Sequence, residues 1–219
     1  MPANGKHKGK VIFTTGDKQI VVEVVGSNLV LPDLANYKGF VEKNGFVSIY
    51  AANFSRRINK QRIQWIVIDD AGYTAKSLQA LPVKVKEASV PTHVEEIKKN
   101  NSFVEYSFYT FSPASPVVTV FSLPTHPLNK NYSMRYAVSV DNGPVRLVDF
   151  RTVGRSDEWK QNVLKNQASR EIQLQFLKKG KHTLRLYAVD PGVVVNRILI
   201  DLGGLKKAYG TINETKIRP

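Results

Sequence analysis

The chain has 219 residues, enough for one large β-domain or for one ordinary domain with a fragment of another. Its 32 Lys and Arg outnumber its 18 Asp and Glu, and the formal net charge of +14 favours polyanionic partners such as nucleic acid, anionic lipid or uronic-acid polysaccharide. It contains no cysteine, which excludes disulfides, thiolate metal sites and a thiol nucleophile. No run of about 18 apolar residues predicts a membrane span, and the polar, basic start lacks the apolar stretch of a secretion signal.

Short apolar and β-branched runs recur along the chain, with turn-forming residues between them. This pattern predicts an all-β fold of two packed sheets. The predicted strands cover residues 10–15, 19–26, 46–54, 64–68, 104–112, 117–123, 134–140, 145–150, 171–177, 182–189 and 193–201. Turn chemistry separates several of them, as DNGP at 141–144, KGK at 179–181 and DPG at 190–192.

The first two predicted strands stand apart from the rest, because residues 27–38 read as a linker with few periodic apolar positions. A lone hairpin is marginally stable by itself. These strands therefore either add to the sandwich or are the remnant of a preceding domain. A second polar interval, residues 86–102, predicts an exposed loop.

One helix is predicted at residues 157–166, after Ser156 as N-cap. Asp157 and Glu158 would lie at the positive end of the helix dipole. Trp159 and Val163 are four residues apart and share a face, so the favoured interpretation is that Trp159 packs the helix onto the sandwich.

Residues 39–209 resemble the C-terminal domain of glycoside hydrolase family 115, the xylan α-glucuronidases. The resemblance rests on five blocks in the family's order: GFVEKNGFVSI with NFSRR, VEYSFYTFS, VTVFSLPTHPLNKNYSMRYAVSVDNGP, WKQNVLKN and GKHTLRLYAVDPGVVVNRILIDLGGLKKAYG. It implies a jelly-roll type β-sandwich similar to carbohydrate-binding modules, here with one short helix, appended to a catalytic barrel. Residues 1–38 would then be the terminal strands and linker of a preceding module, and residues 39–219 the accessory sandwich.

The resemblance also bears on metal binding. Where the family reads roughly VSIEAEHYSR, this chain has VSIYAANFSR, so both acidic positions are lost. In related carbohydrate-binding sandwiches an acid there helps to hold a structural calcium, which takes about six to eight oxygen ligands. Ala52 offers no oxygen and Asp201 alone is no cage, so we expect neither a metal nor a cofactor.

No catalytic set is predicted. Glycoside hydrolysis usually needs two carboxylates about 5–10 Å apart, but the acidic residues of this chain lie mostly at strand ends or turns, where they cap local hydrogen bonds. The family's catalytic residues belong to its barrel, so the resemblance carries none of them over. The parent protein would be a xylan α-1,2-glucuronidase.

Sugar binding needs an exposed aromatic ring beside hydrogen-bonding groups. Two clusters qualify, one around the turn at 69–72 and one on the predicted helix, and two adjacent arginines could pair with a uronate carboxylate. For the aromatic residues, burial in the core is the commoner outcome, and for the arginines a solvated surface pair is commoner. The candidate carbohydrate-binding residues are Trp65, Tyr73, Arg56, Arg57, Trp159, Asn162 and Asn166.

The sequence therefore predicts a non-catalytic accessory domain that recognises glucuronoxylan or supports assembly with a catalytic domain or second subunit, through residues 124–131 and Trp159. The resemblance implies a periplasmic or secreted protein. The alternative is a basic nucleic-acid-binding β-domain. That function would need basic and aromatic residues on one sheet face, which the sequence does not show, so nucleic acid is not the expected partner.

Overall fold

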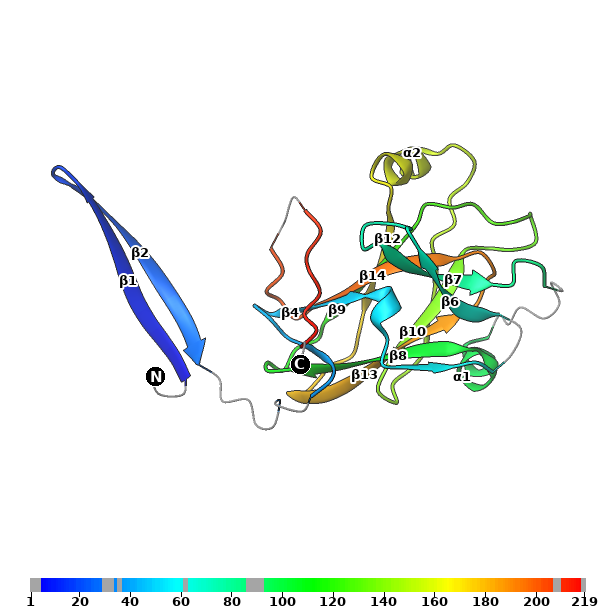
Figure 1. The fold of residues 1–219 in the computed structure, drawn as a ribbon, viewed down its shortest axis with the longest axis horizontal. Helices are drawn as coiled ribbons and strands as arrows, with labels where there is room; N and C mark the ends of the chain where they lie inside the picture. The colour runs from blue at the N-terminus through cyan, green and yellow to red at the C-terminus, as the bar shows by residue number, and fades with distance from the viewer. Residues whose placement is uncertain are drawn as a thin grey trace. The chain divides into compact units, whose positions relative to one another are not determined.

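The computed structural model describes residues 5–28, 34, 37–60, 63–85, 93–206 and 210–217. The chain divides into two compact units, Met1–Tyr37 and Lys38–Pro219 (Figure 1). Most of the predicted linker and part of the loop predicted at 86–102 lie outside the described residues.

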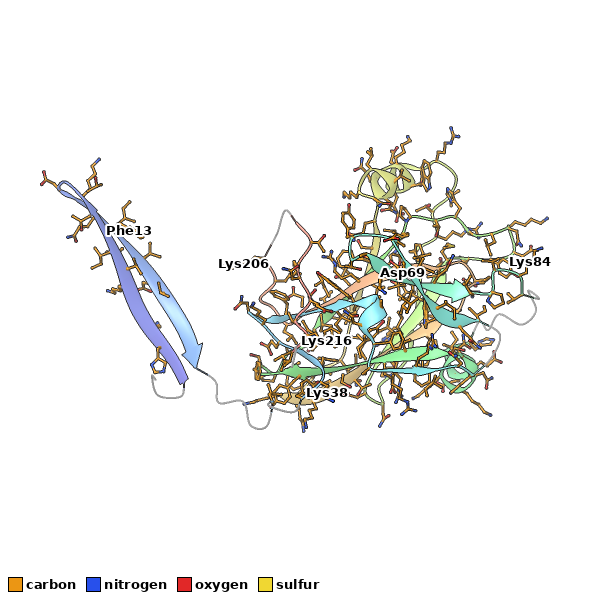
Figure 2. All side chains as sticks on the ribbon, in the orientation of Figure 1. Phe13, Lys38, Asp69, Lys84, Lys206 and Lys216 are labelled. Atoms are coloured by element: carbon orange, nitrogen blue, oxygen red, sulfur yellow. The ribbon has the colours of Figure 1, made fainter. Side chains whose placement is uncertain are left out.

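The first unit is a hairpin of β1 (Gly5–Thr15) and β2 (Lys18–Asn28), paired antiparallel with Val11 opposite Val22. Its side chains project from both faces (Figure 2). The large apolar ones stay exposed, up to 61% for Ile20. Because two strands cannot bury such residues alone, the hairpin has no core of its own. Its origin as the end of a preceding module stays a prediction.

The second unit is a sandwich of two sheets. The first sheet has the order β11-β10-β13-β8-β3, with β5 also paired to β8. Its strands are β3 (Phe40–Val41), β5 (Arg56–Ile58), β8 (Phe103–Thr110), β10 (Arg135–Val140), β11 (Arg146–Asp149) and β13 (Gly180–Ala188). The second sheet has the order β12-β9-β14-β7-β6, with β4 also paired to β14. Its strands are β4 (Phe46–Tyr50), β6 (Gln64–Asp69), β7 (Lys76–Leu81), β9 (Val117–Ser122), β12 (Ala168–Gln173) and β14 (Val194–Asp201).

The core lies between the two sheets and follows the two-residue period of the strands. On β9 and β14, Val120, Ile198 and Ile200 are fully buried in it. Phe121 and Leu199 lie between these positions and therefore point to the opposite face. The predicted all-β jelly-roll sandwich is confirmed.

Two short helices accompany the sheets, not one. Helix α2 (Asp157–Leu164) confirms the predicted helix, and its N-cap Ser156 accepts a hydrogen bond from the Trp159 amide. Helix α1 (Val94–Asn100) lies where a loop was predicted, and that prediction is wrong. No helix among the described residues is long and apolar enough to cross a membrane.

Two features explain why helix α1 forms. Its acidic residues lie in the first turn and its lysines in the last, as the helix dipole favours. Ile97 is fully buried and packs beside Phe103 and Tyr187 on the first sheet. The sequence pattern showed the charges but not this single apolar anchor.

Strand β7 was also missed. Its sequence KSLQAL has no β-branched or aromatic residue, so strand propensity is low. Its place between two strands explains why it forms: β6 pairs along one edge of β7, and the first residues of β14 pair with Leu78 and Gln79 on the other edge. Strands β3 and β5 have two and three residues, too few for a two-residue period to show.

A bulge in β14 controls which side chains face outward. The pairing of β14 with β9 shifts register between Val195 and Arg197. Val195 and Ile198 both belong to the core. In a regular strand, residues 195 and 197 would point to the same face. The extra residue, Asn196, turns Arg197 to the outer face of the sheet.

Candidate functional site

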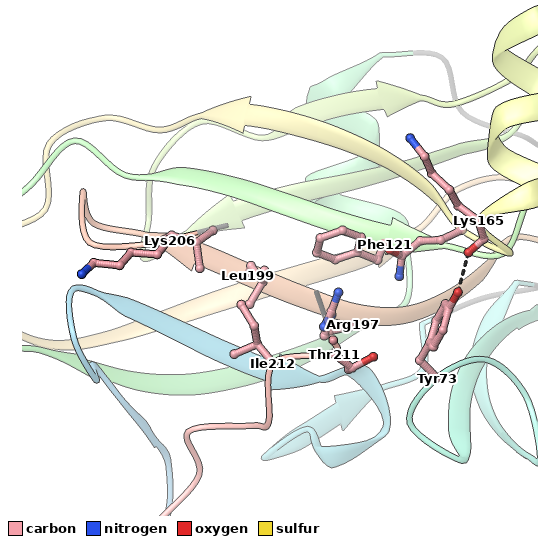
Figure 3. A pocket seen from close by; sticks show the side chains of 11 residues that line it. Tyr73, Phe121, Lys165, Arg197, Leu199, Lys206, Thr211 and Ile212 are labelled. Atoms are coloured by element: carbon pink, nitrogen blue, oxygen red, sulfur yellow. Dashed lines mark hydrogen bonds between the residues drawn. The ribbon is translucent and has the colours of Figure 1, made fainter. Parts of the chain in front are cut away.

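The outer face of the second sheet carries a hollow of about 680 Å³, which we call the Arg197 pocket (Figure 3). Phe121 of β9 and Arg197 and Leu199 of β14 line it. Its rim includes Tyr73, Lys165 and Gln167 on one side and residues 205, 206 and 210–212 on the other. The pocket therefore combines two strands, two loops and the C-terminal segment, residues 210–217.

Hydrogen bonds to β4 and to the chain before it hold the C-terminal segment in place. The Thr215 amide donates to the Ser48 carbonyl at 2.9 Å, and the amide of residue 217 donates to the Gly39 carbonyl at 3.1 Å. Asn53 Nδ2 donates to Glu214 Oε2 at 2.7 Å. These contacts leave residues 210–212 at the edge of the pocket.

The loop that carries Tyr73 is held by the bulge residue Asn196. Asn196 is 2% exposed, and its Nδ2 donates to Thr74 Oγ1 at 2.7 Å and to Ser77 Oγ at 3.0 Å. Gly72 has φ +76°, and a Cβ there would lie 2.6 Å from the same Nδ2. Only glycine fits both the backbone conformation and this close approach. The bulge thus positions both Arg197 and Tyr73.

Arg197 is the most unusual residue of the pocket. The side chain lies over the Phe121 ring, with its Cζ 4.4 Å from the ring centroid. The residue is only 6% exposed, yet its Nε and Nη1 have no hydrogen-bond partner in the described part of the chain. Burial lowers the pKa of Arg197 from its usual value.

Of the predicted candidates, Tyr73 lines the Arg197 pocket and is 52% exposed. Its hydroxyl donates to the Lys165 carbonyl at 2.6 Å, next to the candidate Asn166 (Figure 3). The structure therefore brings the C-terminal end of the predicted helix next to Tyr73, so the two candidate sugar-binding clusters meet there.

Trp65 belongs to the core. It is fully buried, and its Nε1 donates to the Leu186 carbonyl at 3.0 Å. The ring offers no face to a sugar, so its candidacy as a stacking platform is corrected to the core role that large aromatics more often have.

The helix residues stay beside the pocket. Trp159 is half-buried and stacks on His126, with ring centroids 5.5 Å apart and planes at 14°. It packs α2 against the 124–131 loop. Asn162 is half-buried and Asn166 exposed, and neither lines the Arg197 pocket.

The arginine pair lies on β5, in the other sheet. Arg56 Nε is 3.7 Å from Glu105 Oε2, and Arg57 Nη1 donates to the Trp65 carbonyl at 3.4 Å. The structure does not bring them to Tyr73. A role for either in binding a carboxylate stays a prediction.

Phe121, Lys165 and Arg197 were missed as site residues. Arg197 carried a signal, because it interrupts the apolar run VVVNRILI, and an arginine on such a strand is either paired or functional. The signal was ambiguous, since the bulge decides which face residue 197 takes. Phe121 and Lys165 had no distinguishing pattern.

The described residues give no catalytic or metal constellation. No group of three His, Asp or Glu side chains among them converges on a possible ion site. Asp201 Oδ1 accepts the backbone amides of residues 203–205. Asp190 holds Arg135 and Asp141 holds His182, and no described residue that lines the pocket carries a carboxylate.

Comparison with known proteins fits this architecture. The model of the glycosyl hydrolase family 115 C-terminal domain matches residues 39–214. No curated protein matches. Among solved structures, a family GH115 4-O-methyl-α-glucuronidase with specificity for decorated arabinogalactans, BtGH115A, is 27% identical with a TM-score of 0.51, covering 67% of this chain and 17% of its own. The chain thus spans 17% of that relative's length.

Two further structures are more distant. The GH26-CBM35 β-(1,4)-mannanase of Podospora anserina is 11% identical with a TM-score of 0.48, covering 75% of this chain and 29% of its own. A family 35 carbohydrate-binding module of Clostridium thermocellum is 17% identical with a TM-score of 0.43, covering 71% and 96%. On the family match, the chain belongs to the glycosyl hydrolase family 115 C-terminal domains.

Proposed function

We propose that the sandwich is a non-catalytic accessory domain that binds plant cell-wall polysaccharide, with glucuronoxylan as the expected polymer, in the Arg197 pocket. The observation that carries the proposal is a hollow of about 680 Å³ that joins aromatic rings to hydrogen-bonding cations. Ligand pockets typically hold about 300–1,000 Å³ and place a few polar groups on an apolar lining.

The residues of the pocket suit a saccharide. Tyr73 is half exposed and offers a ring to the apolar C–H face of a pyranose. Lys165, Gln167 and Thr211 at the rim supply donors and acceptors for sugar hydroxyls. Because none of the described residues that line the pocket is a carboxylate, bond cleavage would take place in another domain of the parent enzyme, a xylan α-1,2-glucuronidase.

Assembly is the second candidate function, and a different surface supports it. Leu164, the last residue of α2, is 79% exposed, and Val153, in the chain before α2, is 81% exposed. Exposed apolar residues of this size often mark a protein interface. This surface would contact the catalytic domain or a second subunit. Either role places the protein where plant polysaccharide is degraded, in the periplasm or outside the cell.

Affinity electrophoresis and calorimetry of the purified chain test polysaccharide binding, with glucuronoxylan, arabinogalactan and unsubstituted xylan as ligands. We expect glucuronoxylan to bind, and Tyr73→Ala to weaken binding at least about fivefold, because a lost aromatic contact costs about 1 kcal/mol. The control is Phe176→Ala, an exposed aromatic that does not line the pocket. Absence of binding to all three polymers would overturn the proposal.

Two further experiments test the assembly function and the nucleic-acid function. A complex with a purified family 115 catalytic region, lost in Leu164→Asp, would support assembly in place of sugar binding. Binding of an oligonucleotide that falls steeply and linearly with salt on a log-log scale would support the nucleic-acid function.

A further inference from the structure

Arg197 differs from Arg135 and Arg185, two other arginines of the sandwich, in the partners of its guanidinium group. Arg135 holds Asp190 through two bonds of 2.7 and 2.8 Å, and Arg185 holds Glu105 at 2.8 Å. Arg197 is more deeply buried than either, and no salt bridge joins it to a carboxylate of the described residues. Within the described chain, Arg197 is therefore a buried cation without a paired carboxylate.

Such an arrangement is costly for a fold. Moving a charge out of water costs free energy unless the charge is paired. A guanidinium keeps its proton, so it does not avoid this cost by becoming neutral. The Phe121 ring compensates for part of this cost, since a cation over an aromatic face gains about 0.5–2 kcal/mol. A methionine of similar length would fill the same space without the charge. The structure of the free domain therefore gives no reason for an arginine here.

The surroundings of Arg197 favour an anion. Among the described residues that line the pocket, the ionisable cations are Lys165, Lys206 and Arg197, and none is acidic. Three acids lie within about three residues of a lining residue in sequence: Asp201 accepts backbone amides, Glu214 accepts from Asn53, and Asp70 is exposed in the turn before Tyr73. The described lining thus carries one sign of charge, and a hollow lined by one sign of charge concentrates ions of the opposite sign.

We propose that the Arg197 pocket binds a carboxylate, and that the guanidinium of Arg197 pairs with it while Lys165 and Lys206 flank the site. A carboxylate fits because its two oxygens match the planar fork of a guanidinium. Phe121, Leu199 and Ile212 give the pocket apolar walls, which suit the ring of a uronic acid better than a free inorganic ion. This inference rests on the proposed saccharide function, because the uronic acid would be a unit of the bound polysaccharide.

Calorimetry and thermal unfolding of the purified chain with small probes test the site. We expect sodium glucuronate to bind and to raise the melting temperature, since a ligand of the folded state stabilises it by mass action. Glucose, which has a hydroxymethyl group in place of the carboxylate, should bind about 10- to 100-fold more weakly, as loss of a charge-assisted hydrogen bond predicts. Equal affinity for both probes would overturn the inference.

Variants separate binding from folding. Arg197→Met should abolish the glucuronate effect while the free protein melts at the same or a higher temperature, because a desolvated charge is removed. Arg197→Lys should keep the charge and lose most of the affinity, because it lacks the fork. The matched control is Arg135→Met, which leaves the fully buried Asp190 unpaired and should lower the melting temperature without changing glucuronate binding in the folded protein. A large drop in the melting temperature of free Arg197→Met would assign Arg197 a structural role and overturn the inference.

Other probes identify the source of the carboxylate. Acetate that binds as tightly as glucuronate would keep the carboxylate site but contradict saccharide recognition. Phosphate or sulfate that displaces glucuronate at equal concentration would overturn the carboxylate assignment. Glucuronoxylan that binds in an Arg197-independent way would overturn this inference and leave the proposed function intact.

Discussion

The hydroxyl of Tyr73 donates a 2.6 Å hydrogen bond to the carbonyl of Lys165, 92 residues later in the chain. This bond joins the loop after β6 to the end of α2, and both residues line the Arg197 pocket. The rim of the pocket therefore depends on a contact between segments that are distant in sequence.

Removing the Tyr73 hydroxyl should loosen this rim without unfolding the domain. In Tyr73→Phe we expect the free energy of unfolding to fall by at most about 1 kcal/mol, because water can replace the bond at an exposed site. Amide hydrogen exchange at residues 165–167 should become faster. Tyr132→Phe, which loses a bond to the Val85 carbonyl instead, should leave these amides unchanged. Equal exchange in wild type and Tyr73→Phe would show that the bond does not hold the rim.

Asn196→Ala should damage both stability and binding. Asn196 Nδ2 donates to the hydroxyl oxygens of Thr74 and Ser77, and its loss removes this donor from both. We expect a cost of about 1–3 kcal/mol in urea unfolding and weaker glucuronate binding, because the Tyr73 loop is released. Asn101→Ala removes a similarly buried amide, bonded to Ala188 near the first sheet, and should cost stability alone. If Asn196→Ala bound glucuronate with wild-type affinity, the bulge would not contribute to binding in the pocket.

Gly72→Ala and Gly154→Ala form a matched pair. Both glycines have positive φ, +76° and +51°, so alanine at either costs about 1–2 kcal/mol of backbone strain. At Gly154 the new Cβ meets open space, but at Gly72 it collides with Asn196. Thermal unfolding should therefore show a larger loss for Gly72→Ala, by about 1–3 kcal/mol of overpacking. Equal losses would mean that the Asn196 side chain moves aside freely.

The domain should lose stability at alkaline pH. Burial raises the pKa of both Tyr106 and Tyr136 above the usual value of 10.0. Above about pH 10 the unfolded chain releases these protons while the folded domain keeps them, so stability is complete below that pH and falls as pH rises, by up to about 1.4 kcal/mol per unit for each tyrosine. Chemical denaturation from pH 8 to 11 measures this slope.

Phenylalanine substitutions distinguish the two tyrosines. The Tyr136 hydroxyl is buried and has no hydrogen-bond partner in the part of the chain that the structure describes, so Tyr136→Phe should be neutral or stabilising at pH 7 and should reduce the alkaline slope. The Tyr106 hydroxyl donates to the Ala51 carbonyl at 2.7 Å, so Tyr106→Phe should destabilise at pH 7 by about 1–3 kcal/mol. An unchanged alkaline slope in both variants would contradict the proposed cause.

Several parts of the fold and site could be predicted from local chemistry. Alternating apolar residues on β9 and β14, the turn sequences and the Ser156 cap each act within a few residues, so the strands, the sandwich and α2 followed from them. Tyr73 could be identified because it borders a turn. Helix α1 and strand β7 could not, because one buried contact of Ile97 and the edges of neighbouring strands decide them.

The sequence by itself determined the class of fold, the absence of thiol chemistry, the excess of positive charge and the family resemblance, because these depend on residue type and order. Only the tertiary structure decided which aromatic ring is covered and which charge lacks a partner. Trp65 and Arg197 both lie in apolar strands, yet one is satisfied by the Leu186 carbonyl and the other faces a pocket. The physical reason is that a one-residue bulge at Asn196 and contacts across more than 90 positions set these environments, and neither leaves a periodic trace in the chain.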